Sequence, residues 1–104
     1  MEFTSQQRAF LRSCAQTLRP VVMVGKDGES NEVVSALSQA LEHHELVKVK
    51  FQSHKDETAE IAASLARRTD SSLIAVTGFT AVYYREADEK EERRFNLRTL
   101  ELNW

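Results

Sequence analysis

The feature of this sequence that most constrains its fold is a regular alternation of helix-forming segments with short strand-forming runs. Apolar residues recur with a helical period in three segments, and β-branched or alternating residues fill the segments between them. The expected elements are, in chain order, a helix over 4–18, a buried strand over 21–24, a helix that begins at Ser30 or Asn31, a half-buried strand over 46–51, a helix over 57–69, and strands over 73–77 and 80–85. Such alternation implies parallel pairing through helical crossovers, and the last two strands add an antiparallel hairpin. The predicted fold class is therefore a small α/β domain of order α-β-α-β-α-β-β with a four-stranded mixed sheet.

Local signals support the boundaries of these elements. Thr4 and Gln7 have the spacing of a capping box, and Pro20 disfavours helical geometry at the residue before it. Gly78 suits the first central position of a two-residue hairpin turn. In the first helix, the residues expected to face the core share one side; they are Phe10, Leu11, Cys14 and Leu18.

The composition fits one folded domain and excludes several other classes of protein. The chain has 104 residues, of which 41% are hydrophobic, with only 3 Gly and 1 Pro, which is typical of a globular domain rather than a disordered or collagenous chain. The apolar runs are too short for a membrane-spanning helix, and the first residues lack the pattern of a secretory signal. The single cysteine, Cys14, excludes an internal disulfide and fits a reducing compartment. We therefore expect a cytoplasmic protein without a membrane partner.

Charge is distributed unevenly along the chain. The net charge is −2, yet residues 3–26 contain four basic residues and no acidic one, whereas residues 86–104 contain six acidic and four basic residues. We expect residues 1–85 to form the folded domain and residues 86–104 to form a charged C-terminal tail. A basic surface beside an acidic tail is compatible with an anionic partner.

The sequence contains no arrangement typical of an enzyme or a metal site. His43 and His44 are adjacent, so on a helix they point about 100° apart and cannot hold one metal ion from one side. His54 is distant in sequence from both, and Cys14 lies on an apolar stripe. Nucleotide-binding and hydrolase motifs are absent. We therefore expect no catalytic residue, no metal, no cofactor and no small-molecule substrate.

Three arginines and one glycine-containing loop are candidate contacts for phosphate groups. Arg8, Arg12 and Arg19 lie within about 40° of one another at 100° per residue, on the side of the first helix opposite its apolar stripe. The loop Gly25-Lys26-Asp27-Gly28 joins a strand to a helix, where glycines admit a phosphate backbone and Lys26 supplies a positive charge. The alternatives are an ordinary solvated helix surface for the arginines and a turn that needs a positive φ for the loop.

A second candidate surface involves two strands. Lys48 and Lys50 share one side of their strand, and Tyr83 and Arg85 share one side of the last strand. If these sides coincide, they form a basic, partly aromatic surface on which an unstacked base could stack against Tyr83. The alternative is an open sheet surface kept soluble by its lysines.

Four segments closely resemble a known family of RNA-binding domains. They are residues 23–28 (MVGKDG), 40–50 (ALEHHELVKVK), 76–78 (VTG) and 82–85 (VYYR). With their spacing, these segments resemble the CRM domain, named for chloroplast RNA splicing and ribosome maturation, in its single-domain bacterial YhbY type. The resemblance covers about residues 3–85 and implies a fold similar to the C-terminal domain of bacterial translation initiation factor three. It also implies RNA binding and association with precursors of the large ribosomal subunit, through a Gly-x-x-Gly loop at Gly25 to Gly28 and the basic first helix.

Together these features predict a non-enzymatic, monomeric protein that binds ribosomal RNA during assembly of the large subunit. Lys26 and the arginines would contact phosphates, and Asp27 is expected to weaken the contact made by the loop. The main alternative is a protein-binding adaptor that reaches assembling ribosomes through residues 86–104. In that case deletion of the tail, rather than loss of basic side chains, would abolish the association.

Overall fold

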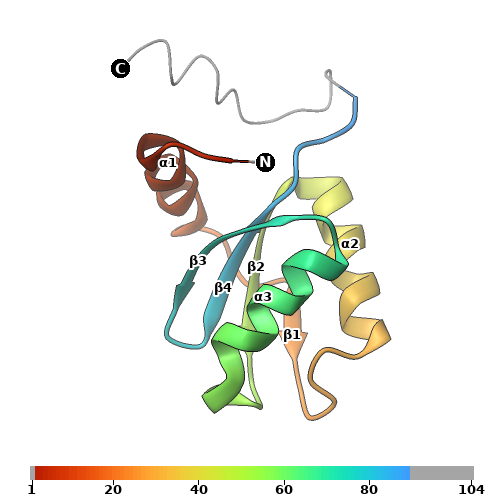
Figure 1. Ribbon diagram of the computed structural model, residues 1–104. Helices are drawn as coiled ribbons and strands as arrows, with labels where there is room; N and C mark the ends of the chain where they lie inside the picture. Colours follow the sequence, from red (N-terminus) through yellow and green to blue (C-terminus); the bar gives the residue numbers. More distant parts are fainter. Residues whose placement is uncertain (1, 90–104) are drawn as a thin grey trace.

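The protein folds into the predicted order of helices and strands, as the computed structural model shows for residues 2–89 (Figure 1). The elements are α1 (Ser5–Ala15), β1 (Val22–Val24), α2 (Asn31–His44), β2 (Leu46–Phe51), the 3₁₀ turn η1 (Lys55–Glu57), α3 (Thr58–Arg68), β3 (Ser72–Thr77) and β4 (Thr80–Tyr84). The strands form one sheet of order β1-β2-β4-β3, in which β1 is parallel to β2 and the other pairs are antiparallel. The predicted α/β class with a four-stranded mixed sheet is therefore confirmed. Residues 90–104, most of the predicted tail, lie outside the described part of the chain.

Side chains named from the sequence cap the helices and form the hairpin turn. The Thr4 hydroxyl accepts a hydrogen bond from the Gln7 backbone N–H, and the Gln7 side chain accepts one from the Thr4 N–H at 2.8 Å, which completes the capping box. Ser30 caps α2 by accepting the Val33 N–H. Gly78 has a φ of 59° in the turn between β3 and β4, as a two-residue hairpin requires.

The sheet separates two hydrophobic clusters. The larger lies between the sheet and the pair α2 and α3, and the smaller lies between the other side of the sheet and α1 (Figure 1). Fully buried members of the larger cluster include Val24, Leu37, Phe51, Leu65 and Tyr83. Members of the smaller cluster include Leu11, Ala15, Leu46, Ile74 and Tyr84. Because side chains alternate in direction along a strand, β2, β3 and β4 contribute to both clusters, whereas β1 contributes only to the larger one.

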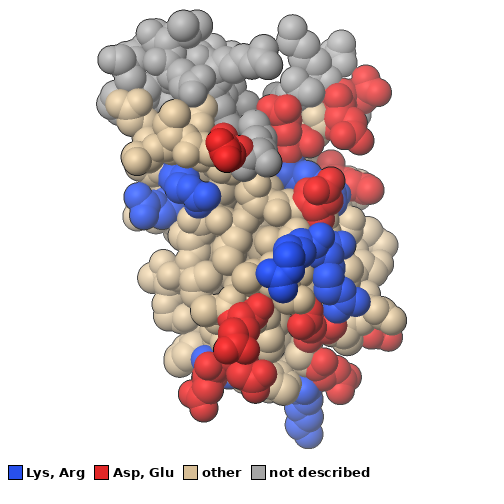
Figure 2. Space-filling view, in the orientation of Figure 1, with Lys and Arg blue, Asp and Glu red and all other residues tan. Residues whose placement is uncertain are grey.

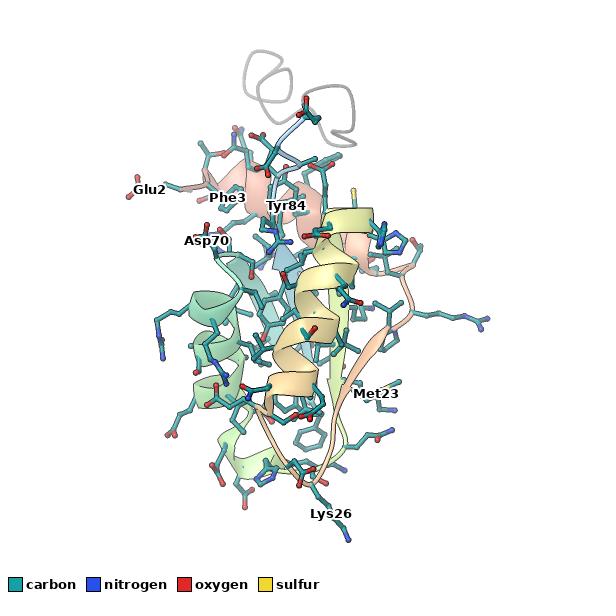
Figure 3. All side chains as sticks on the ribbon, turned by 90° about the vertical axis from the view of Figure 1, so that its right-hand side faces the viewer. Glu2, Phe3, Met23, Lys26, Asp70 and Tyr84 are labelled. Atoms are coloured by element: carbon teal, nitrogen blue, oxygen red, sulfur yellow. The ribbon has the colours of Figure 1, made fainter. Side chains whose placement is uncertain are left out.

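The helix α1 covers only part of its side of the sheet. In β1, Val22 and Val24 are buried, but Met23 is 44% exposed, and Val21 just before the strand is 58% exposed. Figure 3 shows Met23 pointing away from α3. Because Val22 and Val24 belong to the cluster on the α2 and α3 side, alternation along the strand directs Met23 to the other side, on which α1 packs. The prediction that the whole run 21–24 is buried was therefore wrong, because no helix among residues 2–89 covers the α1 side of β1. We call the surface formed by α1 and by this side of the sheet the α1 face.

The buried stripe of α1 differs from the predicted one. It consists of Gln7, Leu11 and Ala15, whereas Phe10 and Leu18 are more than a third exposed. The helix also ends at Ala15, three residues before the predicted end. Beyond it, the Leu18 N–H donates a hydrogen bond to the Ala15 carbonyl, outside the regular helix. Compared with the predicted stripe, the buried side of α1 lies closer around the helix to Arg8 and Arg12. These two arginines therefore lie beside the buried side of the helix rather than opposite it.

Candidate nucleic-acid interface

Acidic residues are absent from the described elements that form the α1 face. Among the described residues, α1, the loop that follows it and the four strands contain no aspartate or glutamate. They contain five basic residues, which are Arg8, Arg12, Arg19, Lys48 and Lys50. The elements α2, η1 and α3 instead carry five acidic residues (Glu32, Glu42, Asp56, Glu57 and Glu60) against three basic ones (Lys55, Arg67 and Arg68). Figure 2 looks at that second side and shows acidic atoms above and below a central basic group, with further basic atoms at the left and lower edges.

A groove of about 610 Å³ runs between α1 and the sheet. One wall is α1, through Ala9, Arg12, Ser13 and Gln16, and the sheet supplies residues of β2, β3 and β4. Arg12 is exposed on the helix wall, and Lys48 reaches the groove from β2. The described lining contains no acidic residue, so its two charged groups both attract an anion.

The lysine row of β2 continues this surface beyond the groove. Lys48 and Lys50 are two residues apart, which places them about 7 Å apart on the same side of the strand. Lys50 pairs with the exposed Met23 of β1 and with Thr80 of β4. Arg19 is exposed in the loop between α1 and β1. Of the predicted contacts, Arg12, Lys48 and Lys50 therefore lie on the α1 face, and Arg19 is exposed in the loop that follows α1.

The glycine-containing loop forms a tight turn at the end of β1. The Gly28 N–H donates to the Gly25 carbonyl at 3.0 Å, and Gly28 has a φ of 61°. Gly28 therefore needs glycine for its backbone conformation. At Gly25, an added Cβ would meet no atom within 4 Å. The surface of the loop at Gly25 is therefore open to an approaching group. Lys26 and Asp27 are exposed, and Figure 3 shows Lys26 extending from the tip of the loop.

His54 holds this loop from the neighbouring β2–η1 connection. Its Nε2 lies 2.6 Å from the Lys26 carbonyl oxygen, and since a carbonyl can only accept, Nε2 carries the proton. A Cβ at Gly28 would lie 3.6 Å from two atoms of the His54 ring, so the ring packs directly on the turn. The Nδ1 of His54 faces Glu57 at 3.8 Å. The sequence did not identify this support, because the two segments are 28 residues apart and no local pattern links them.

Arg8 has a structural role rather than the predicted exposed position. Its Nη1 donates to the carbonyls of Leu73 and Ile74, each at 3.2 Å, and its guanidinium lies 5.6 Å from the centre of the Phe3 ring. Both carbonyls belong to the irregular stretch of β3 between Leu73 and Ala75, where the register shifts. At such a bulge, backbone groups leave the regular ladder and need other partners. Arg8 supplies one, and this fastens α1 to the sheet.

The predicted surface shared by Lys48, Lys50, Tyr83 and Arg85 does not exist. Tyr83 pairs with Val47 and Lys48 pairs with Val82, so Tyr83 and the lysines lie on opposite sides of the sheet. Tyr83 is fully buried, its hydroxyl donates to the Ala62 carbonyl at 2.9 Å, and burial raises the pKa of its phenol well above the usual value, with the charge of Glu29 adding to the effect. It is therefore unable to stack on a base.

Arg85 is likewise engaged within the domain. Its guanidinium donates to the Thr69 carbonyl at 2.7 Å, to the Ser38 carbonyl at 2.8 Å and to the Ser38 hydroxyl at 3.2 Å. These bonds connect the end of β4 to α2 and to the end of α3. Arg85 and Tyr83 are therefore removed from the candidate interface.

The remaining reactive groups form no second site in residues 2–89. No group of three or more His, Cys, Asp or Glu side chains there could hold a metal ion. Burial raises the pKa of the Cys14 thiol, while a hydrogen bond from its own backbone lowers it by less, so the thiol is a weak nucleophile. None of the helices described could span a membrane; the longest, α2, has 14 residues against the about 20 that a bilayer needs.

The fold and the α1 face define a class of small α/β domains with a basic, acid-free surface suited to a polyanion. Comparison with known proteins identifies the family. Residues 3–85 match the CRS1/YhbY (CRM) domain, and the chain belongs to this family.

Several relatives have similar lengths and carry related names. A Bacillus subtilis protein named "Probable RNA-binding protein YqeI" is 34% identical over 86% of this chain and 94% of its own length. A Haemophilus influenzae protein named "RNA-binding protein" is 36% identical over 83% of this chain and 88% of its own. The solution structure of a hypothetical Staphylococcus aureus protein matches with a TM-score of 0.75 and 33% identity, covering 91% of this chain and all of the other. The names describe binding proteins, which supports the prediction that this chain is not an enzyme.

Proposed function

We propose that this protein binds RNA through the α1 face and the glycine-containing loop, as a non-enzymatic factor in assembly of the large ribosomal subunit. The observation that carries the proposal is the segregation of charge: five basic residues and no acidic one on α1, its following loop and the four strands. A phosphate backbone is the partner that such a surface attracts most strongly. The names of the relatives support RNA in particular, and the resemblance to the CRM domain supports ribosomal RNA.

Each basic group has a defined task in this proposal. Arg12, Arg19, Lys48 and Lys50 contact phosphates along the α1 face, and Lys26 contacts one at the tip of the loop. Gly25 allows the RNA backbone to approach the main chain of the loop, because no side chain projects there. Phosphate contacts fix the position of the protein but carry no sequence information directly. Five contacts predict a log–log salt slope of roughly −3.5 to −4.5.

The experiment is a titration of the protein into large-subunit ribosomal RNA over a series of salt concentrations. The variants Arg12→Ala and Arg67→Ala form a matched pair, since each removes one exposed arginine from a helix, on the α1 face and on α3 respectively. Arg12→Ala is expected to weaken binding and to flatten the salt slope by about 0.7–0.9. Arg67→Ala is expected to leave the slope unchanged.

Two results would count against the proposal. Absence of binding by the wild type at low salt would exclude direct recognition of this RNA. Equal effects of the two variants would mean that the protein attracts RNA only through its total charge, without a defined surface. A competition with small-subunit ribosomal RNA tests the ribosomal part separately, because the proposal requires the large-subunit RNA to bind more tightly.

A further inference from the structure

The groove between α1 and the sheet has features that phosphate contacts alone do not explain. Resting on the proposed RNA-binding function, we infer that this groove holds one unstacked base of a single-stranded RNA segment, with the neighbouring phosphates on Arg12 and Lys48. The chemical class of the ligand is thus a single-stranded ribonucleotide segment rather than an RNA duplex.

The shape of the groove comes from small side chains and from the irregularity in β3. Ile74 packs against Leu11 in the cluster under α1, whereas Ala75, the next residue, lines the groove. The register shift between Leu73 and Ala75 brings these consecutive side chains to the same side of the sheet. Because Ala75 on the sheet and Ala9 and Ser13 on the helix wall all have small side chains, space remains in the groove that larger residues would fill. The resulting volume of about 610 Å³ is in the range of small-ligand sites.

The lining combines the groups that a nucleobase needs. Apolar contact for a ring comes from Ala75 and Val82. Hydrogen-bonding groups that can reach base edges are Ser13, Gln16, Thr77 and Thr80. The guanidinium of Arg12 stands beside these groups on the helix wall and supplies positive charge for a neighbouring phosphate.

The groove favours a single strand over a duplex for a geometric reason. In a duplex the base edges are paired and the faces are stacked, so no base can enter a space between a helix and a sheet. Loops, bulges and single-stranded ends present bases that are already unstacked. Phosphates on either side of such a base would then reach Arg12 on the helix wall and Lys48 on β2.

The test fills the groove without changing its charge. Ala9→Leu places a larger side chain on the helix wall, and Ala59→Leu is the matched control, since Ala59 is an exposed alanine near the start of α3. The probe is a fluorescent single-stranded RNA of about ten nucleotides, compared with the same strand annealed to its complement. The wild type is expected to bind the single strand more tightly than the duplex. Ala9→Leu is expected to lower single-strand affinity about tenfold while leaving the salt slope unchanged, and Ala59→Leu is expected to change neither.

A second variant, Ala75→Val, fills the floor of the groove from a strand and is expected to act in the same direction. Thermal unfolding of both variants shows that each retains the fold. The inference is overturned if folded Ala9→Leu and Ala75→Val bind the single strand as the wild type does, or if the duplex binds equally well. Those results leave the proposed function intact, whereas failure of the wild type to bind either RNA removes the proposed function itself.

Discussion

Arg8 and Arg12 lie one helical turn apart, yet the structure gives them opposite roles. Arg8 is half-buried and donates to two carbonyls of β3, whereas Arg12 is exposed on the groove wall. Replacing each with alanine removes the same charge from the same helix. We expect Arg8→Ala to destabilise the fold with a small effect on RNA contacts, and Arg12→Ala to do the reverse.

The magnitude for Arg8 follows from its contacts. Hydrogen bonds from a charged donor contribute about 1.5–3 kcal/mol, and the lower end applies because one Nη1 is shared between two carbonyls at 3.2 Å. The cation–π contact with Phe3 adds about 0.5 kcal/mol. The free energy of unfolding should therefore fall by about 2 kcal/mol, which lowers the melting temperature by roughly 8–15 °C. For Arg12→Ala the change should stay within about 0.5 kcal/mol.

The assay is urea unfolding followed by circular dichroism, together with RNA titration of the same preparations. Arg8→Lys serves as a further control, because it keeps the charge but lacks the planar fork that reaches both carbonyls. It should lose part of the stability and retain the salt slope of the wild type. The reasoning is refuted if Arg12→Ala is the less stable of the two alanine variants, or if Arg8→Ala flattens the salt slope more than Arg12→Ala.

Three further predictions concern the loop and the core. His54→Ala removes the support of the loop, so RNA affinity should fall severalfold at an unchanged salt slope, and the backbone amide signals of the loop around Lys26 should shift in NMR spectra. Gly28→Ala should lower the free energy of unfolding by about 1 kcal/mol because of its positive φ, whereas Gly25→Ala should leave stability unchanged and weaken RNA binding. Tyr83→Phe should cost about 1 kcal/mol at neutral pH through loss of the bond to the Ala62 carbonyl. Burial raises the pKa of the Tyr83 phenol in the folded protein. The stability that Tyr83 contributes is therefore fully present below the unfolded pKa of about 10 and declines above it. The unfolding free energies of the wild type and of Tyr83→Phe should then converge from about pH 10 upward.

Each of these predictions has a result that would contradict it. An unchanged loop spectrum in His54→Ala would mean that the turn holds its shape without the ring. Equal unfolding midpoints for Gly28→Ala and Gly25→Ala would contradict the claim that only Gly28 needs glycine for its backbone conformation. A constant stability difference between wild type and Tyr83→Phe across the alkaline range would exclude ionisation of the buried phenol as the cause.

The fold was predictable because its determinants are local. Thr4 and Gln7 cap one helix, Ser30 caps another, and Gly78 sets the hairpin turn, each within a few residues of the structure that it specifies. The alternation of helical and strand periods then left few topologies for a chain of this length. No contact between distant segments had to be known for the fold class.

The candidate site was only partly predictable, because several of its contacts are non-local. The side on which Tyr83 lies depends on its register opposite Val47, and a shift by one residue reverses it. The partners of Arg8 are 65 and 66 residues away in β3, and the irregular register that exposes them has no clear sequence signal. The exposed residues Arg12 and Lys26 were correctly assigned to the surface, since neither requires a partner within the domain.

The most direct test of the central claim is an NMR titration of the isotopically labelled protein with large-subunit ribosomal RNA fragments. Backbone amide shifts report which surface the RNA contacts, independently of any substitution. We expect the changes to concentrate on α1 around Arg12, on β2 around Lys48 and Lys50, and on the loop around Lys26. Changes concentrated on α2 and α3, with the α1 face unaffected, would contradict the account.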